Sequence, residues 1–275
     1  MALVPFFGHG GVPAPGGQDP ESDPEDGVGA KMTFLEHLDE LRKRIMVAVA
    51  AIGVACLISF GFVDRIYQFV MDPLSRLLPK GSTFIFTEPT EAFILYVKMA
   101  LLAGIIIAIP VVMWQAWLFI APGLYQKEKR LAFPFVFLAS VGFIGGAAFT
   151  HYLLFPWMWT FFASFATDKL LFAPKIEPVF ELYVKMILGM GLVFQMPAVI
   201  YFMARMGLVT ARFLIKNFKY AILIIFIVAA VVTPSGDMLT QTLFAAPMIG
   251  LYLLSILIAW LFGKKRKSAP AEEEA

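Results

Sequence analysis

The sequence predicts an all-α integral membrane protein with six transmembrane helices and with its amino and carboxyl ends in the cytoplasm. Sixty per cent of the 275 residues are hydrophobic and 15% are charged, whereas soluble domains average nearer half apolar and a quarter charged. Apolar runs of about 20 residues, the length that crosses about 30 Å of hydrocarbon, recur along the chain. Lysine and arginine are also distributed unevenly between successive connections, which indicates an orientation in the membrane.

The two ends of the chain differ from its middle in composition. Residues 1–30 combine glycine and proline with five acids and hold no apolar core, which predicts a disordered leader rather than a secretory signal. Residues 31–262 form the predicted membrane domain, and residues 263–275 a charged cytoplasmic tail. Cys56 is the only cysteine, which rules out an intramolecular disulfide and a cysteine-based metal site. We expect no cofactor and no metal, and the net charge of +2 gives no indication of nucleic-acid binding.

The six predicted spans are apolar runs separated by polar connections. They cover about residues 45–63, 92–117, 131–155, 180–204, 220–232 and 240–262. The fifth has 13 residues, which make roughly 20 Å of helix, so a re-entrant hairpin of the fifth and sixth segments is an alternative. The two segments cross together or not at all, because the basic cluster Lys264–Lys267 would otherwise lie outside.

The orientation follows from the basic residues in the short connections. Fifteen of the 22 lie on the side of the two chain ends, and five lie on the opposite side. The remaining two, Lys98 and Lys185, lie just inside predicted spans, where their side chains can snorkel outward. The amino terminus is therefore predicted to be inside the cell.

A short internal similarity relates the second and fourth spans. Leu95-Tyr-Val-Lys-Met99 recurs as Leu182-Tyr-Val-Lys-Met186, and both spans start on the same side, unlike the inverted repeats of many transporters. Similar membrane-entry chemistry and an ancient duplication both explain it. Prolines predict kinked or interrupted helices and a bowed bundle. They are Pro110, Pro134, Pro156, Pro197 and Pro247.

The first candidate site residue is Glu40, in an amphipathic helix that precedes the first span. Thr33 and Glu36 form a capping box that starts this helix. Glu40 has two interpretations. It forms an ordinary i,i+4 ion pair with Arg44, or its carboxylate belongs to a binding site at the cytoplasmic surface.

A second candidate is Glu128, in the connection between the second and third spans. It lies among basic residues and follows the turn signal Pro122-Gly123. The alternative is an acid favoured by the dipole at a helix amino end. Phe119 and Tyr125 are interface aromatics on the simpler interpretation.

Polar residues inside spans are candidates for function, because burying them in hydrocarbon is costly. Gln195 lies mid-span, where the alternative is a structural interhelical hydrogen bond. Thr233, Asp237 and Gln241 cluster at the outer ends of the fifth and sixth spans. His151, near an outer helix end, receives no role. The common metalloprotease, P-loop and serine-nucleophile motifs are missing and no acid pair lies within one predicted span, so the chain is predicted not to be an enzyme.

Three segments are specific when they are taken together and in order. They are His37-Leu-x-Glu-Leu-Arg-x-Arg44, Trp117-x-Phe-Ile-Ala-Pro-x-Leu-Tyr125 followed by Glu128, and Thr233-Pro-x-x-Asp-x-x-x-Gln241. With them the chain closely resembles the TatC family, the multispanning core of the twin-arginine protein translocase, from about residue 32 to residue 262. The resemblance implies six spans in a concave, glove-like wall that receives folded cargo through a signal peptide with consecutive arginines.

The resemblance also implies a role for each carboxylate. Glu40 and Glu128 would bind the two arginines, because a guanidinium offers parallel donors to a carboxylate. Lysine lacks this planar fork and should substitute poorly. The remaining members of the same patch would be Arg42, Phe119, Leu124 and Tyr125.

Partners follow from the same resemblance. The single-span subunits TatA and TatB would bind at Thr233, Asp237 and Gln241, and we expect self-association and contact with the lipid bilayer. Pro73 matches a position that the family needs for function. The family often has glutamate where this chain has Gln195, and the segment before Asp237 is one residue longer than in some members.

The predicted function is a signal-peptide receptor and scaffold that exports folded proteins across the bacterial cytoplasmic (inner) membrane with energy from the proton gradient. The alternative is a small-molecule secondary transporter, which would need a midplane site of broken helices and ionisable residues. Gln195 beside Pro197 is the only candidate for such a site. A membrane enzyme, the third interpretation, lacks catalytic residues.

Overall fold

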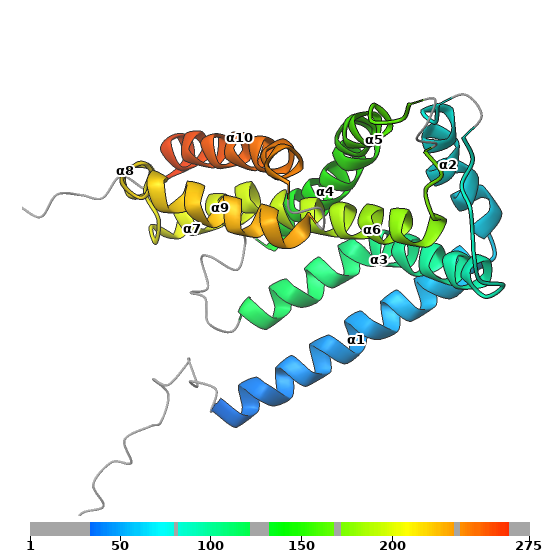
Figure 1. Ribbon diagram of the computed structural model, residues 1–275. Helices are drawn as coiled ribbons and strands as arrows, with labels where there is room; N and C mark the ends of the chain where they lie inside the picture. The colour runs from blue at the N-terminus through cyan, green and yellow to red at the C-terminus, as the bar shows by residue number, and fades with distance from the viewer. Residues whose placement is uncertain (1–33, 80–81, 122–131, 168–171, 234–236, 264–275) are drawn as a thin grey trace, which may run out of the picture.

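The computed structural model describes residues 34–79, 82–121, 132–167, 172–233 and 237–263, which are helical apart from connections and one isolated bridge between Ile85 and Lys175. The helices follow one another in Figure 1 as α1 (Phe34–Phe60), α2 (Val63–Arg76), α3 (Glu91–Ile120), α4 (Ala132–Phe149), the π-helical turn η3 (Thr150–Leu154), α5 (Phe155–Ala163), α6 (Ile176–Val193), α7 (Met196–Met206), α8 (Ala211–Lys216), α9 (Phe218–Val232) and α10 (Met238–Phe262).

Within the residues that the structure describes, five helical runs are long and apolar enough to cross a membrane, and a sixth apolar helix is shorter. The five are Leu35–Phe60, Glu91–Ile120, Ala132–Ala163, Ile176–Met206 and Met238–Phe262. The shorter helix is α9, which contains the fifth predicted span. The predicted fold class, an all-α membrane protein, is confirmed, and the five long apolar helices together with α9 fit the predicted count of six spans. The cytoplasmic location of the two ends stays a prediction.

The connection between α1 and α3 contains a helix, α2, that the sequence analysis did not predict. Val70, Met71 and Leu74 are buried on one side of it, and Asp72 is exposed, a spacing typical of an amphipathic helix. Pro73 was expected in an outer loop but lies inside α2. Proline has no N–H to donate to the carbonyl oxygen of Phe69 four residues earlier, so α2 lacks one helical hydrogen bond there.

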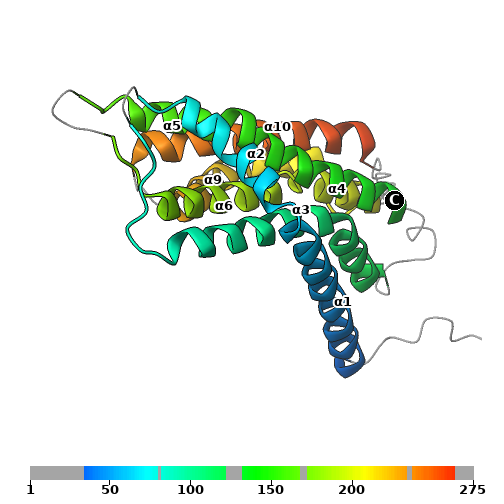
Figure 2. The ribbon, with the colours of Figure 1, turned by 90° about the vertical axis from the view of Figure 1, so that its right-hand side faces the viewer.

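Helix α1 packs along α3 and has few contacts elsewhere. In Figures 1 and 2 it lies at the edge of the bundle, with α3 as its neighbour. Gly104 permits the approach of the two backbones, because a Cβ atom there would lie 2.7 Å from both the Cα and the nitrogen of Cys56. The opposite side of α1 is apolar and exposed, with Leu57 at 77%. That side is available to lipid or to another protein.

The main core lies among the remaining helices. In both views α5 and α10 lie above α6 and α9, and α3 lies below them. Phe155 of α5, Phe180 of α6 and Phe244 of α10 are fully buried in this core. Each large aromatic ring removes much apolar surface from its surroundings, so these three residues hold the upper layers together.

The fourth predicted span is interrupted between α6 and α7. Pro197 explains the break, because it has no N–H to donate to the carbonyl oxygen of Val193 four residues earlier. Gln195 lies in the break, and its Nε2 donates a hydrogen bond to the Ala139 carbonyl oxygen of α4 at 2.9 Å. Gln195 therefore makes the interhelical hydrogen bond that was one of its two interpretations.

We expect Gly104→Ala to destabilise the protein, because the added methyl group must push α1 away from α3. Overpacking of this kind costs typically about 1–3 kcal/mol. Thermal unfolding of the purified chain in detergent measures the effect. Gly53→Ala is the matched control, since a Cβ atom at Gly53 of α1 would meet nothing within 4 Å. Equal melting temperatures for the two variants would contradict this packing.

We expect Gln195→Glu to make stability depend on pH. An ionised carboxylate cannot donate to the Ala139 carbonyl oxygen, whereas a protonated carboxyl group can. The variant should therefore lose stability as the pH rises, relative to wild type, and regain it as the pH falls. Melting temperatures of both proteins between pH 3 and pH 8 (a span of about five units that includes the ordinary glutamate pKa of about 4.3) provide the measurement. Parallel curves would show that the hydrogen bond to Ala139 is unimportant.

Candidate functional site

The carboxylate of Glu40 is only half satisfied. Its Oε1 accepts a hydrogen bond from Nη2 of Arg44 at 2.9 Å, within α1, which is the ordinary i,i+4 ion pair that the sequence allowed. Its Oε2 is buried and has no hydrogen-bond partner among the described residues, and neither has Nε of Arg44. The Glu40 side chain is 15% exposed. A buried charged oxygen without a donor is costly, so this atom is suited to accept a hydrogen bond from a ligand.

A ring stack connects the start of α1 to the end of α3. The rings of His37 and Phe119 lie 4.4 Å apart between centroids, at an angle of 18°. His37 precedes Glu40 by about one helical turn, so the stack holds Glu40 near the carboxyl end of α3. Two residues predicted for one patch, Glu40 and Phe119, are thus brought to the same end of the bundle. This end lies at the left of Figure 1, together with α8.

Of the other predicted members of this patch, the structure describes only Arg42. Arg42 is exposed on α1. Leu124, Tyr125 and Glu128 fall in residues 122–131, outside the described residues. The structure therefore positions the first carboxylate and one aromatic ring of the predicted site, and the second carboxylate belongs to the connection that begins after Ala121.

The polar residues at the junction of α9 and α10 each make a hydrogen bond to the backbone. Oγ1 of Thr233 donates to the Ala229 carbonyl oxygen at 2.8 Å. Oδ1 of Asp237 accepts from the backbone N–H of Thr240 at 2.7 Å and so caps α10. Nε2 of Gln241 donates to the carbonyl oxygen of Phe226 in α9 at 2.8 Å. The last bond joins the two helices directly.

Apolar side chains surround this junction. Val231 at the end of α9 is 80% exposed, and Met238 at the start of α10 is 83% exposed. Apolar surface beside a small polar cluster is suited to packing against another transmembrane helix. The cluster therefore remains a candidate partner site, although its hydrogen bonds within the chain already stabilise the fold.

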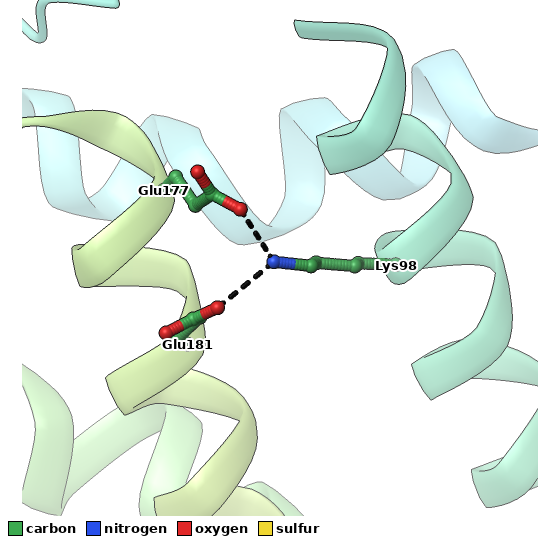
Figure 3. Close-up of polar contacts among 3 residues, drawn as sticks. All are labelled: Lys98, Glu177 and Glu181. Atoms are coloured by element: carbon green, nitrogen blue, oxygen red, sulfur yellow. Dashed lines mark hydrogen bonds and ion pairs between the residues drawn. The ribbon is translucent and has the colours of Figure 1, made fainter. Parts of the chain in front are cut away.

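Lys98 was expected to extend outward, but it forms two ion pairs with α6, as Figure 3 shows. Its Nζ donates to Oε1 of Glu177 at 2.6 Å and to Oε1 of Glu181 at 2.9 Å. The two glutamates lie one helical turn apart and so face the same neighbour. The predicted fourth span started at residue 180 and separated them. Their i,i+4 spacing was the signal that could have revealed this acid pair.

His151 received no role from the sequence, yet it is buried where three elements meet. It lies in η3, is 4% exposed, and its Nδ1 is 2.9 Å from the hydroxyl oxygen of Tyr183 in α6. Its ring also stacks on Phe69 of α2 at 4.3 Å. Through these contacts His151 helps to hold α2 against the core. A single histidine in an apolar run carries no signal of this in the sequence.

A pocket of about 440 Å³ lies beside Gln195, between α6, α7 and α9. Its lining is otherwise apolar, from Gly189, Leu192, Val193, Met196, Val199, Ile200, Val228 and Val232. Within the parts of the chain that the structure describes, this lining includes no ionisable group. Solute transport coupled to ions needs such groups at the midplane, so this pocket does not favour the transporter interpretation.

Comparison with known proteins identifies the family of the chain. The family model of TatC, Sec-independent protein translocase protein, matches residues 36–247. A Sec-independent protein translocase protein TatC of Desulforapulum autotrophicum is 43% identical over 245 residues, which cover 89% of this chain and 90% of the relative. The corresponding protein of Koribacter versatilis is 40% identical over 249 residues, 88% of this chain and 91% of that one.

A solved structure is also similar. The crystal structure of a twin-arginine translocase receptor, TatC, superposes with a TM-score of 0.72 at 32% identity and covers 81% of this chain and 97% of that one. The predicted family is thereby confirmed, and the apolar helices fit a protein that crosses the bacterial inner membrane several times. The chain belongs to the TatC family of Sec-independent protein translocase proteins.

Proposed function

We propose that this chain is the receptor and scaffold for signal peptides with consecutive arginines, and that Glu40 and Glu128 bind one arginine each. The observation that carries the proposal is the buried Oε2 of Glu40, which has no hydrogen-bond partner among the described residues. An incoming guanidinium supplies the missing donor while Arg44 keeps its bond to Oε1. Charge-assisted hydrogen bonds of this kind contribute about 1.5–3 kcal/mol.

The geometry also explains a preference for arginine over lysine. Glu40 offers a single buried oxygen beside the guanidinium of Arg44. A planar guanidinium can stack against Arg44 or a nearby aromatic ring while it donates, and it is more weakly hydrated than an ammonium group. Phe119, held by His37, supplies a ring at this end of the bundle. A lysine would lose more hydration in the same place and gain fewer contacts.

The proposed orientation places this patch in the cytoplasm, where signal peptides are made. The basic residues near the start of α1 and after α7 support this orientation through the positive-inside rule. We also propose that single-span subunits of the TatA and TatB type bind at the α9–α10 junction, and that the exposed side of α1 contributes to self-association. Energy would come from the proton gradient through assembly with these subunits.

Photo-crosslinking of a twin-arginine signal peptide to the protein in membranes tests the receptor site. We expect Glu40→Ala and Glu128→Ala each to reduce crosslinking roughly tenfold or more, since each removes at least one charge-assisted bond. A peptide with two lysines should crosslink equally weakly to the wild-type protein. Asp39→Ala is the matched control, because Asp39 is an exposed acid beside Glu40 on α1. Undiminished crosslinking in both glutamate variants, at normal protein levels, would contradict the proposed site.

Gln241→Leu tests the partner site separately. Loss of one interhelical hydrogen bond in a membrane costs about 0.6 kcal/mol on average, so the variant should fold and still crosslink the signal peptide. Disulfide crosslinking between a cysteine at Met238 and the single-span subunits should fall, because the polar contact for the partner is gone. Thr242→Val, which removes a hydroxyl bonded within α10 to Met238, is the control. An unchanged yield in Gln241→Leu would place the partner elsewhere.

A further inference from the structure

An open groove separates α3 from α6 close to the end of the bundle where α2 lies. It has a volume of about 340 Å³. Its floor is apolar and is made of Leu101, Leu102, Ile105, Val184 and Leu188. Lys98, Glu181 and Lys185 form its rim. The groove therefore combines a charged mouth with an apolar channel beneath it.

The rim holds charges of both signs. Lys98 uses Oε1 of Glu177 and Oε1 of Glu181 (Figure 3), so each carboxylate keeps its second oxygen for another donor. Lys185 follows Glu181 by one helical turn and is exposed. No ion pair within 4.0 Å joins Lys185 to an acid among the described residues. Glu177 lies just outside the groove lining as the second partner of Lys98, so the charges at the mouth balance when it is included.

The position of the groove matches the order of groups in a phospholipid. Lys98 lies seven residues after Glu91, the start of α3, which is about 10 Å along the helix. The floor continues from there to Ile105, about 10 Å further along α3 toward the middle of the span. Charged groups thus lie near the helix ends, where headgroups are, and apolar side chains follow in the direction of the acyl chains. Water would have few polar partners along this floor.

We propose that this groove binds a phospholipid with a zwitterionic, primary-amine headgroup of the phosphatidylethanolamine type. The phosphate lies at Lys185, the ammonium group donates to the second oxygen of Glu181 at the rim, and one acyl chain lies along the floor. A purely anionic headgroup fits less well, because the two carboxylates repel it. A choline headgroup also fits less well, because its quaternary nitrogen has no N–H to donate. This inference is independent of the proposed signal-peptide site.

Thermal unfolding of the purified full chain in detergent tests the site. Phosphatidylethanolamine, phosphatidylcholine and phosphatidylglycerol with identical acyl chains are added in turn, since a ligand that binds the folded state raises the melting temperature. We expect the largest rise with phosphatidylethanolamine. Lys185→Gln and Glu181→Gln should each weaken its apparent affinity roughly tenfold, because each removes one charge-assisted contact. Lys175→Gln and Glu88→Gln, which change exposed residues outside the groove lining, should have no effect.

A further variant separates lipid binding from a general loss of folding. Leu101→Trp fills the groove floor and leaves the rim charges in place, so it should abolish the response to phosphatidylethanolamine without lowering the melting temperature of the lipid-free protein. An equal rise with phosphatidylglycerol would indicate an anion site and overturn the proposal. Equal rises with all three lipids, insensitive to the rim variants, would also overturn it. So would a disulfide from Leu101→Cys to another polypeptide in membranes, because a protein would then occupy the groove.

Discussion

The close packing of α1 on α3 determines where Glu40 lies, and the proposed binding site depends on it. Gly104 lets the two backbones approach at Cys56, and the stack of His37 on Phe119 joins the helices again beside Glu40. Helix α1 packs along α3 and makes few contacts with any other helix. Its remaining surface is left for lipid or partners.

The same packing explains why a carboxylate oxygen can remain buried and unsatisfied. Arg44 lies four residues after Glu40 and satisfies one oxygen, whereas the second oxygen faces a place where the described chain supplies no donor. Such a residue destabilises the unliganded protein and favours a ligand that brings the missing donor. A site of this kind can discriminate strongly, because a ligand without the donor leaves the carboxylate as costly as before.

Much of the fold could be predicted from the sequence, because the length of each apolar run and the distribution of lysine and arginine between the connections are visible in local sequence. The runs that became α1, α3 and α10 were recognised in this way. Helix α2 was missed, since its mean composition is polar and its apolar stripe is short. The break at Gln195 was predicted only as a kink or an interruption at Pro197. The hydrogen bond to Ala139 could not be foreseen, because residues 56 positions apart meet there only through the packing of α4 on α6.

The candidate site was predicted more by resemblance than by physical pattern. Glu40 and Arg44 alone indicate nothing beyond an ion pair, and the stack of His37 on Phe119 depends on tertiary structure. Lys98 shows the opposite case, since two acids at i,i+4 spacing were visible but were divided by a predicted span boundary. The partner of a charged residue near the end of a transmembrane helix can therefore be assigned only when the neighbouring helix is known.

A double-mutant cycle tests the central claim that the Glu40 carboxylate binds an arginine of the signal peptide. The binding free energy is measured for wild-type protein and Glu40→Gln, each with the natural peptide and with a peptide in which one arginine is replaced by glutamine. We predict a coupling energy of about 1.5–3 kcal/mol for one of the two arginines, since the pair is charged and desolvated. A coupling energy near zero for both arginines would show that Glu40 acts on the peptide indirectly or not at all.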